Sequence, residues 1–444
     1  MKFVIVLTAL VCILLIADIL LNPSVKIKEH RIKIIYWFIP LAGAVVLLLS
    51  GHLKLSEVMA GLSSSGSVNP VKILILFISM TTLSIYLDEA GCFSYLAGIS
   101  LKYAKTSQSK LFLYLYLMVS VLTVFTSNDI IILTFTPFIC YFSKKASINP
   151  LPYLFGEFVA ANTWSMFLII GNPTNIYLAT SAGVSFFEYT KTMFLPTLFA
   201  GTVTFIVLRL IFAKELAKPI SAEMSEKEIS NVPIVVLGVI HLGVCTLLLV
   251  ISSYIGLEMW LITLAFAVSL TICTLIMHFI QKKKKGSKYV DPKTDKILLH
   301  TFVRAPWQLI PFVISMFLLV LSLEKYGVTS RIAELLAEDH TIVKYGIASF
   351  LSANVMNNIP MAVLFSSVTS PLEGLMKARA VYASVIGSNL GAYFTPLGAL
   401  AGIMWNGILK KMHVEFSFKR FIIYGAPISF AALAAALAGL CITL

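Results

Sequence analysis

The sequence contains little charge. Asp, Glu, Lys and Arg make up only 12% of its 444 residues, against roughly 25% in an average soluble domain. Hydrophobic residues make up 58%. A chain with so few charges lacks the polar surface of a soluble domain of this length, so the composition excludes an ordinary soluble protein.

Motifs for metal, nucleotide and covalent chemistry are also missing. The six cysteines are scattered, with no Cys-x-x-Cys pair and no histidine at metal-ligand spacing, so we interpret them as small packing residues. No Ser/His/Asp arrangement, Gly-rich phosphate loop or ATP-binding motif stands out. We therefore expect no metal, no cofactor and no enzymatic activity. Drive by ATP would require a separate ATPase subunit.

Long apolar runs are what the sequence does contain. A run of about 18 or more apolar residues spans the ~30 Å hydrocarbon core of a bilayer as a helix. The runs predict an all-α integral protein of the cell (plasma) membrane. The first run is followed by Asn22-Pro23 and not by a small-residue cleavage site, which indicates a retained helix. The ten predicted crossings are 3–21, 34–50, 71–88, 157–180, 193–213, 232–253, 258–280, 300–323, 380–406 and 420–443.

The net charge of +13 is distributed in a way that excludes a nucleic-acid partner. Most basic residues lie in short segments between apolar runs, and the largest cluster is 282–296. Basic loops face the cytoplasm, and threading the ten crossings by this rule places both termini outside. We interpret 282–296 as a solvated linker, with regulation by anionic lipid as the alternative.

Two apolar segments, 111–143 and 341–370, do not fit as crossings. Each is too long for one span and is broken near its middle by polar residues, which predicts two re-entrant hairpins with polar tips. Backbone that is not helical at membrane depth is tolerated only where it is buried in protein or lines a cavity. The first hairpin is predicted to enter from the cytoplasm and the second from outside. The polar tips are Ser127, Asn128 and Asp129 in the first hairpin and Asn357 and Asn358 in the second.

The two halves of the chain look related. Residues 78–91 align with 314–327 at a constant offset, sharing Ile-Ser-Met at the start and Gly at the end. The spans 157–180 and 380–406 each contain a proline that predicts a broken helix. We therefore predict an inverted repeat of 1–228 and 229–444, a pattern typical of secondary transporters that bind solute near the bilayer midplane.

Asp129 is the residue at the tips that can change charge. A carboxylate at membrane depth is costly and is functional by default, so we assign it to the coupling ion, H⁺ or Na⁺. The alternative is a helix cap. Asp88 and Glu89 are interpreted as a solvated helix end. The predicted substrate-binding residues are Ser127, Asn128, Asn172, Pro173, Thr174, Asn357, Asn358, Asn389 and Thr395.

The sequence resembles the ion transporter superfamily, and within it the arsenite/antimonite efflux permeases of the ArsB type, which are related to sodium/dicarboxylate and NhaD-type carriers. Where that type tends to have acids in the two broken helices, this chain has Asn162 and Asn389. The resemblance implies a secondary transporter, and homodimers are common among such relatives. It rests on the stretches "YLDEAGCFSYLA" (86–97), "FTSNDIIILTFTP" (125–137), "VMNNIPMAVL" (355–364) and "VIGSNLGAYFTPLGALAGIMW" (385–405) and on their spacing.

Three functions remain open from the sequence. The first is ArsB-like export of arsenite, antimonite or a similar small solute in exchange for protons. The second is sodium- or proton-coupled transport of a carboxylate or other anion, or Na⁺/H⁺ antiport, within the same superfamily. The third is a channel or a membrane scaffold. A fixed carboxylate at the tip disfavours an anionic substrate, because like charges 4 Å apart repel by about 4 kcal/mol at an effective dielectric constant of 20.

Overall fold

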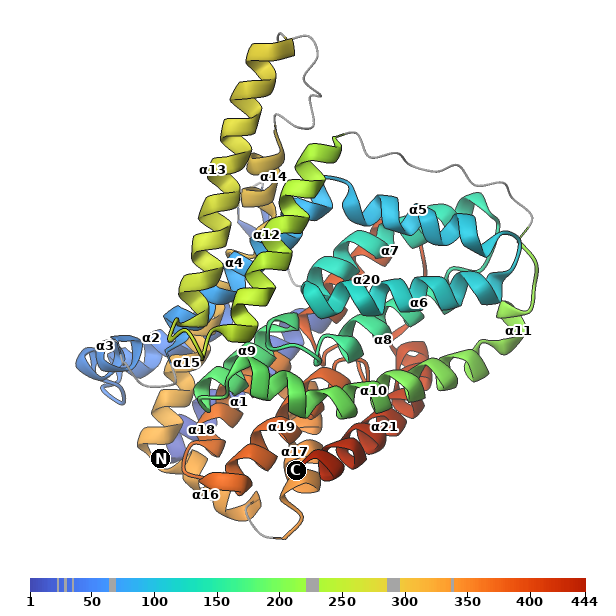
Figure 1. Ribbon diagram of the computed structural model, residues 1–444. Coiled ribbons are helices and arrows are strands. Elements are labelled where there is room, and N and C mark those ends of the chain that lie inside the picture. The colour runs from blue at the N-terminus through green and yellow to red at the C-terminus, as the bar shows by residue number, and fades with distance from the viewer. Residues whose placement is uncertain are drawn as a thin grey trace.

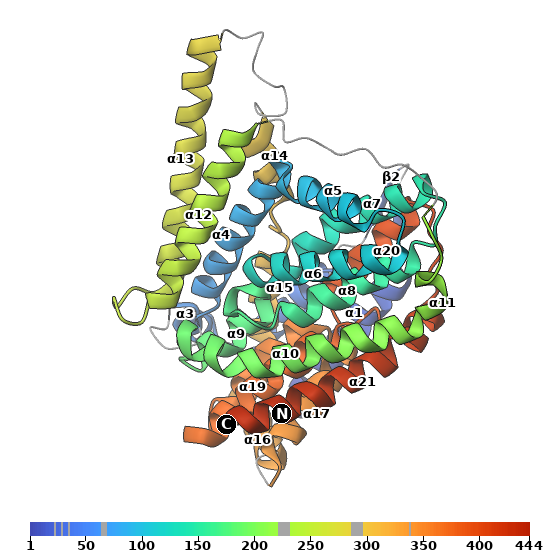
Figure 2. The ribbon, with the colours of Figure 1, turned by 45° about the vertical axis from the view of Figure 1, so that its right-hand side comes forward.

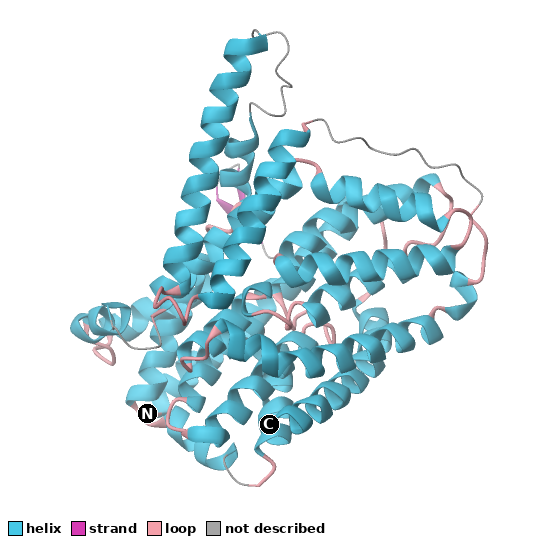
Figure 3. Ribbon diagram, in the orientation of Figure 1, coloured by secondary structure: helices cyan, strands magenta, loops and turns pink. Residues whose placement is uncertain are grey.

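The computed structural model describes residues 1–21, 24–27, 30–33, 36–63, 69–220, 231–285, 296–336 and 339–444. Helices dominate this part of the chain (Figure 3), which also contains a short antiparallel hairpin of β1 (Ser24–Ile27) and β2 (His30–Lys33). The prediction of an all-α membrane protein is thus confirmed in its essentials. The helices before the first hairpin are α1 (Lys2–Leu21), α2 (Phe38–Leu49), α3 (Leu55–Ser63), α4 (Pro70–Glu89) and α5 (Cys92–Ala104).

Seven helical segments among the described residues are long and apolar enough to cross a membrane. The predicted crossing 34–50 is instead the 12-residue helix α2, and 300–323 is interrupted before Pro306, which cannot continue a helix without losing a hydrogen bond. The total of ten crossings stays a prediction. The seven segments are α4, Gln108–Phe125 (α6), Phe186–Ile211 (α10), Val232–Ile251 (α12), Met259–Ile280 of α13 (Met259–Lys285), Ile297–Lys325, which comprises α14 (Ile297–Arg304) and α15 (Leu309–Lys325), and Phe418–Thr443 (α21).

Both predicted hairpins are pairs of contacting helices. In the first, α6 ends at Phe125 and α7 (Asn128–Lys145) begins after two residues of extended backbone. In the second, α17 (Thr341–Met356) and α18 (Asn358–Thr369) are separated by Asn357 alone. The breaks therefore fall where the polar triplets predict them, while the side from which each hairpin enters stays a prediction.

Both predicted broken helices are also present. The first consists of α8 (Leu151–Trp164), a 3₁₀ turn η1 (Ile169–Gly171) and α9 (Pro173–Ser181). The second consists of α19 (Gly374–Gly391) and α20 (Leu400–Lys411). Pro173 occupies the first position of α9, where its missing N–H would have no helical partner in any case.

The order of elements from α4 to α10 recurs from α15 to α21. Each series runs from a long helix through a short one (α5; α16, Val328–Leu336), a hairpin and a broken helix to a 26-residue helix containing a proline, Pro196 or Pro427. The last helices, α10 and α21, pack side by side (Figures 1 and 2). α11 (Ala213–Leu216) follows α10, and the predicted boundary between the halves, 228/229, lies outside the described residues.

The hairpin and the broken helix of each series pack against those of the other series. α7 of the first hairpin packs against α20, and α9 of the first broken helix packs against α18 of the second hairpin. α12 and α13 lie beside α4 at one flank (Figures 1 and 2). The interrupted segments of both series are thereby gathered in the interior, where their free backbone and polar side chains meet.

Candidate functional site

The first hairpin tip is tied to the first broken helix by a pair of amides. The Asn128 side chain is 1% exposed, and its Nδ2 donates to Oδ1 of Asn162 on α8 at 3.0 Å. Asn162 in turn donates through Nδ2 to the Phe158 carbonyl oxygen at 2.8 Å, which fixes the orientation of its amide. A residue that replaces an acid expected from the resemblance thus serves as a neutral partner of the tip.

Asn389 joins the two broken helices. Its Oδ1 accepts from Ser165 Oγ at 3.0 Å and from Asn172 Nδ2 at 2.9 Å. Its Nδ2 donates to Asn175 Oδ1 at 2.7 Å and to the Val385 carbonyl oxygen at 2.8 Å. Asn389 is fully buried, so all its hydrogen-bonding capacity is met by protein groups from α19, α8 and α9.

The break between α8 and α9 is held by two asparagines. Asn172 Oδ1 accepts from the backbone N–H and the hydroxyl of Thr174, at 3.1 and 3.0 Å, and so caps α9. Asn175 Nδ2 donates to the carbonyl oxygens of Ser165 and Leu168 at 2.8 and 3.2 Å. These carbonyls are left without helical partners by the interruption, and Asn175 satisfies them inside the protein.

Ser165 Oγ also lies 2.9 Å from the Asn162 carbonyl oxygen, so these contacts form one continuous set of uncharged groups, which we call the amide network. It combines side chains from the first hairpin tip and from both broken helices, and every member is an amide or a hydroxyl. The members of the amide network are Asn128, Asn162, Ser165, Asn172, Thr174, Asn175 and Asn389.

The second hairpin tip is tied to the second broken helix. Asn357 has φ +76°, and its Nδ2 donates to the Leu397 carbonyl oxygen at 3.2 Å in the α19–α20 break. One turn earlier, Asn354 Oδ1 accepts from the N–H and hydroxyl of Thr395 at 3.1 and 2.7 Å. The second tip and the second break therefore form a unit. Tyr393 links this unit to α8 through its hydroxyl, 3.0 Å from Thr163 Oγ1.

Four buried oxygen atoms at these places accept or donate no hydrogen bond within the described part of the chain, and we call them the open oxygen atoms. Such groups are uncommon because leaving a buried polar group unpaired costs about 1–3 kcal/mol. They lie at both tips and beside Asn389. The open oxygen atoms are Ser127 Oγ, Asn128 Oδ1, Asn358 Oδ1 and Ser388 Oγ.

Asp129 lies in the first turn of α7, directly behind the tip. A negative charge in this position is stabilised by the helix dipole. Asp129 is not the cap predicted as the alternative role, because the N-cap position belongs to Ser127. Its side chain is partly exposed and interacts electrostatically with Tyr36, and it has no ion-pair partner among the residues that the structure describes. It is therefore an accessible carboxylate beside a neutral site.

The structure brings most of the predicted site residues together, and it adds others. Asn172, Pro173, Thr174 and Asn389 meet at the first break, whereas Asn357 and Thr395 meet at the second. Sequence reasoning missed Ser165, Asn175, Ser388 and Asn354 as members of the site. The sequence did contain a signal for these residues, because an amide or hydroxyl side chain in an apolar helix at membrane depth is expected to form a hydrogen bond with another helix.

The interpretation of Asp88 and Glu89 as a solvated helix end is wrong. Arg304 of α14 forms an ion pair with Asp88 at 2.7 Å and also contacts Glu89, and His300 Nδ1 lies 3.3 Å from Glu89. The sequence could not reveal this cluster because Arg304 lies more than 200 positions away.

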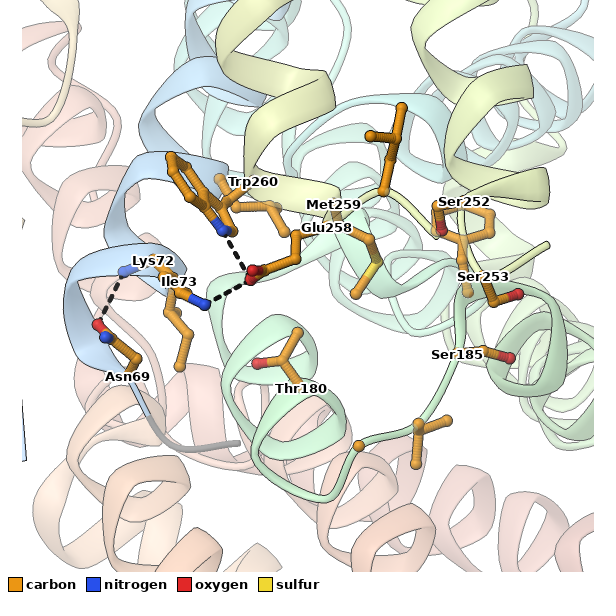
Figure 4. Close-up of a pocket in the computed structure, with 15 residues that line it drawn as sticks. Asn69, Lys72, Ile73, Thr180, Ser185, Ser252, Ser253, Glu258, Met259 and Trp260 are labelled. Carbon is orange, nitrogen blue, oxygen red and sulfur yellow. Dashed lines mark hydrogen bonds and ion pairs between the residues drawn. The ribbon is translucent and has the colours of Figure 1, made fainter. Parts of the chain in front are cut away.

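A pocket of about 370 Å³ lies away from these residues, between α4, α9, α10, α12 and α13 (Figure 4). Its two charged side chains pair with each other: Lys72 Nζ is 2.6 Å from Glu258 Oε2, which also accepts a hydrogen bond from Trp260 Nε1 at 2.8 Å. It includes none of the predicted site residues, so its size alone does not make it the transport site.

Comparisons with known proteins identify membrane transport proteins as relatives. Residues 27–372 match the CitMHS family, described as "Citrate transporter". The "Arsenical pump membrane protein" of Escherichia coli is 26% identical over 420 residues, which cover 90% of this chain and 93% of that protein. The protein of the same name from Yersinia enterocolitica is 28% identical over 388 residues, which cover 83% of this chain and 86% of its own.

Two solved structures share the fold. The YdaH transporter of Alcanivorax borkumensis has a TM-score of 0.54 at 13% identity, with coverage of 99% of this chain and 97% of its own. MtrF of Neisseria gonorrhoeae has a TM-score of 0.50 at 12% identity, with coverage of 99% and 94%. At these identities the likeness concerns the fold alone. The family match, which covers most of the chain, shows that it belongs to the CitMHS family and is a membrane transporter.

Proposed function

We propose that this transporter exports a small uncharged polyhydroxy solute of the arsenite or antimonite kind in exchange for protons. The observation that carries the proposal is the chemistry of the site: an amide network with open oxygen atoms at both tips, beside a single accessible carboxylate. Amides and hydroxyls offer both donors and acceptors. A trihydroxy metalloid presents the complementary set without any net charge to neutralise.

The relatives named arsenical pump membrane proteins support this choice. The family name points instead to citrate, and sodium- or proton-coupled transport of a carboxylate is the alternative, together with Na⁺/H⁺ antiport. A citrate site needs groups that compensate negative charge. No Lys or Arg belongs to the amide network, and Asp129 would repel an anion by about 4 kcal/mol at 4 Å and an effective dielectric constant of 20.

In this proposal Asp129 takes up and releases the coupling proton while the neutral groups hold the solute. The two series of helices act as inverted repeats, 1–228 and 229–444, which alternate the access of one site. The protein lies in the plasma membrane, with its basic segments on the cytoplasmic side and both termini on the outer side. The homodimer implied by the resemblance and a separate ATPase subunit stay predictions.

Transport by the purified protein in liposomes tests the proposal. Arsenite, antimonite, citrate, succinate and Na⁺ are offered singly under an imposed pH or Na⁺ gradient, with empty liposomes as the blank. We expect accumulation of arsenite or antimonite that depends on the pH gradient. Accumulation of citrate or Na⁺ without any metalloid transport would contradict it and favour the alternative.

A further inference from the structure

Glu157 is a second acid of the first half, and it is buried more deeply than Asp129. It lies on α8, is 2% exposed, and both of its carboxyl oxygens lie within reach of Thr136 Oγ1, at 3.0 and 3.1 Å. No basic side chain among the described residues pairs with it. A carboxylate buried without a cation is strongly disfavoured, so Glu157 holds a proton as a neutral carboxylic acid in this state.

The position of Glu157 relates it to the candidate site. α7 and α8 touch at two levels along the same seam: Asn128 meets Asn162 at the tip, and Thr136 meets Glu157 further on. Thr136 is eight residues beyond Asn128 on α7, about 12 Å along a helix. The direction is toward the end of α7 that carries Lys144 and Lys145, which the positive-inside rule assigns to the cytoplasm.

Polar groups continue along this seam in both directions. On α7, Asp129, Thr136 and Ser143 are spaced by seven residues, so they lie on one face of the helix. Ser143 is 1% exposed, and its hydroxyl has no partner within the described chain. On α8, Tyr153 lies one turn from Glu157 on the same face, and its hydroxyl donates to Gln108 Oε1 at 3.0 Å.

We call this row of polar groups on α7 and α8 the stripe, and its members Ser143 and Tyr153 lie at the same level. The rings of Phe142, beside Ser143, and Tyr153 are 5.7 Å apart. Gln108, the first residue of α6, directly follows the loop that precedes the first hairpin. The stripe therefore runs from the tip of the hairpin to its base, inside an otherwise apolar region.

Titratable side chains on the helices that pack against α8 provide Glu157 with no countercharge. Cys140 of α7 acts on it electrostatically. On α6, Tyr116 is engaged with the Gly201 carbonyl oxygen at 2.8 Å and with Thr204, both on α10. On α19, Arg379 donates to the Leu444 carbonyl oxygen at 3.0 Å. No described residue therefore offers Glu157 a positive charge that would favour its ionised form.

We propose that Glu157 is a proton-relay residue between Asp129 and the cytoplasmic end of the hairpin, positioned by Thr136. This inference rests on the proposed function, since it assigns the route by which the coupling proton leaves the site. Glu157 first releases its proton past Ser143 and Tyr153 to water at the cytoplasmic end of the hairpin, which leaves a Glu157 carboxylate. The proton bound by Asp129 then passes to Glu157, which leaves an Asp129 carboxylate and restores the carboxylic acid of Glu157.

The first test requires no substrate. Infrared difference spectra of the purified protein in H₂O and D₂O report the C=O stretch of protonated carboxyl groups. At neutral pH we expect a wild-type band that is missing in Glu157→Gln and retained in Asp129→Asn. If the wild type and Glu157→Gln show the same bands, Glu157 carries no proton and the proposal is overturned, whatever solute the protein transports.

The second test separates relay from structure. In liposomes with antimonite, Glu157→Gln should slow pH-driven transport on the order of a hundredfold, the range for loss of a positioned proton-transfer group. Antimonite exchange at equal pH should persist, because no net proton movement is required. Thr136→Val should give a smaller loss and shift the dependence on the pH at the Lys144–Lys145 side only.

Thr204→Val is the matched control, because it removes a buried hydroxyl of α10 that lies outside the stripe. We expect it to leave both pH dependences unchanged. Wild-type coupled transport in Glu157→Gln, or an equal shift in Thr204→Val and Thr136→Val, overturns the relay. If Glu157→Gln does not fold, Thr136→Val decides, through transport and through the infrared band, whose frequency should shift because the hydroxyl that contacts Glu157 is gone. If the wild type moves no metalloid, the proposed function fails while the infrared result still decides whether Glu157 holds a proton.

Discussion

The two hairpins share an architecture and differ in chemistry. The first, over 111–143, contains one acid, Asp129, whereas 341–370 contains no Asp or Glu. The first break is an extended two-residue stretch, and the second is a single residue, Asn357, in the left-handed region with φ +76°. When Ser127-Asn128-Asp129 is aligned with Met356-Asn357-Asn358, the position of Asp129 is occupied by Asn358.

The acids at the ends of α4 and α15 also differ. Asp88 at the end of α4 is paired with Arg304. Glu324 at the end of α15 is exposed and accepts a hydrogen bond from Ser367 of the second hairpin at 3.1 Å. The first half thus has an acid at its hairpin tip and a neutralised acid at the end of α4, whereas the second half has a neutral tip fixed by Asn357.

Moving the acid from one tip to the other should have the largest effect. Asp129→Asn preserves side-chain size but removes the proton, so gradient-driven accumulation in liposomes should collapse while exchange persists. Folding should be unchanged or slightly improved, because a costly carboxylate is lost. Asn358→Asp should place an unpaired carboxylate at a position that is 3% exposed, which lowers the yield of folded protein without restoring coupling in the double variant.

The asymmetry would be refuted by either of two results. If the Asp129→Asn variant still concentrates solute with wild-type pH dependence, Asp129 is not the coupling residue. A double variant Asp129→Asn, Asn358→Asp that accumulates solute as the wild type does would show that the two tips are interchangeable. Membrane insertion of each variant, followed by size-exclusion chromatography in detergent, controls for misfolding.

Removing Asn389, which joins the two halves, should have the next largest effect, on stability. Asn389→Ala leaves the hydroxyl or amide groups of Ser165, Asn172 and Asn175 without this partner, at about 1–3 kcal/mol for each group left buried and unpaired. The thermal unfolding midpoint of the purified protein should fall clearly. Ser388→Ala is the neighbouring control and should change little, since Ser388 Oγ is one of the open oxygen atoms. Equal effects of the two substitutions would contradict the assigned network.

Backbone strain distinguishes the two tips more subtly. Asn357→Ala loses the contact with Leu397 and must keep φ +76° with ψ 155°, a conformation that glycine alone adopts readily, at a cost of about 1–3 kcal/mol. Asn357→Gly loses the same contact without the strain, so it should unfold at a higher temperature than Asn357→Ala. At the first tip, where Ser127 has φ −97°, Ala should be tolerated at least as well as Gly. The opposite order at either tip would contradict the assigned backbone.

The smallest effect is expected away from both hairpins, at the ion pair of Lys72 and Glu258. Hydrogen bonds from Lys72 and Trp260 hold the pKa of Glu258 below its ordinary value. A depressed carboxyl pKa means that the pair stabilises the protein above the ordinary pKa of Glu and loses this contribution as pH falls through the lowered value. Because the pair is exposed, Glu258→Gln should change stability by less than about 1 kcal/mol. Transport with wild-type pH dependence in this variant confirms that the larger effects belong to the hairpins.

Much of the fold could be predicted because each signal was local. Apolar run length predicted the long helices, and polar triplets in apolar runs predicted the breaks at Ser127 and Asn357. Proline is favoured at the first position of a helix, so Pro173 correctly marked the start of α9, whereas Pro196 and Pro427 lie inside long helices. The span 34–50 was overestimated because hydropathy does not report where a helix starts, and α2 begins only at Phe38.

The site was predicted only in part, because partners in an amide network are chosen by packing. Asn162 and Asn389 were visible as neutral residues in place of acids, but the sequence could not show that one binds Asn128 and the other joins three groups of α8 and α9. The pairing of Asp88 with Arg304 was hidden for the same reason. Sequence periodicity gives the face on which a side chain lies, and it does not give the helix opposite.

The sequence by itself determined that the chain lies in a membrane, where its helices break, and which side chain at the tips can carry charge. These follow from residue type and spacing, since a bilayer excludes unpaired polar groups regardless of the rest of the chain. The tertiary structure decided which amides satisfy one another, and it placed Glu157 against Thr136 on the seam that leads from the tip. Only the packing of α7 on α8 brings these groups within hydrogen-bonding distance, because no local rule links residues 21 positions apart.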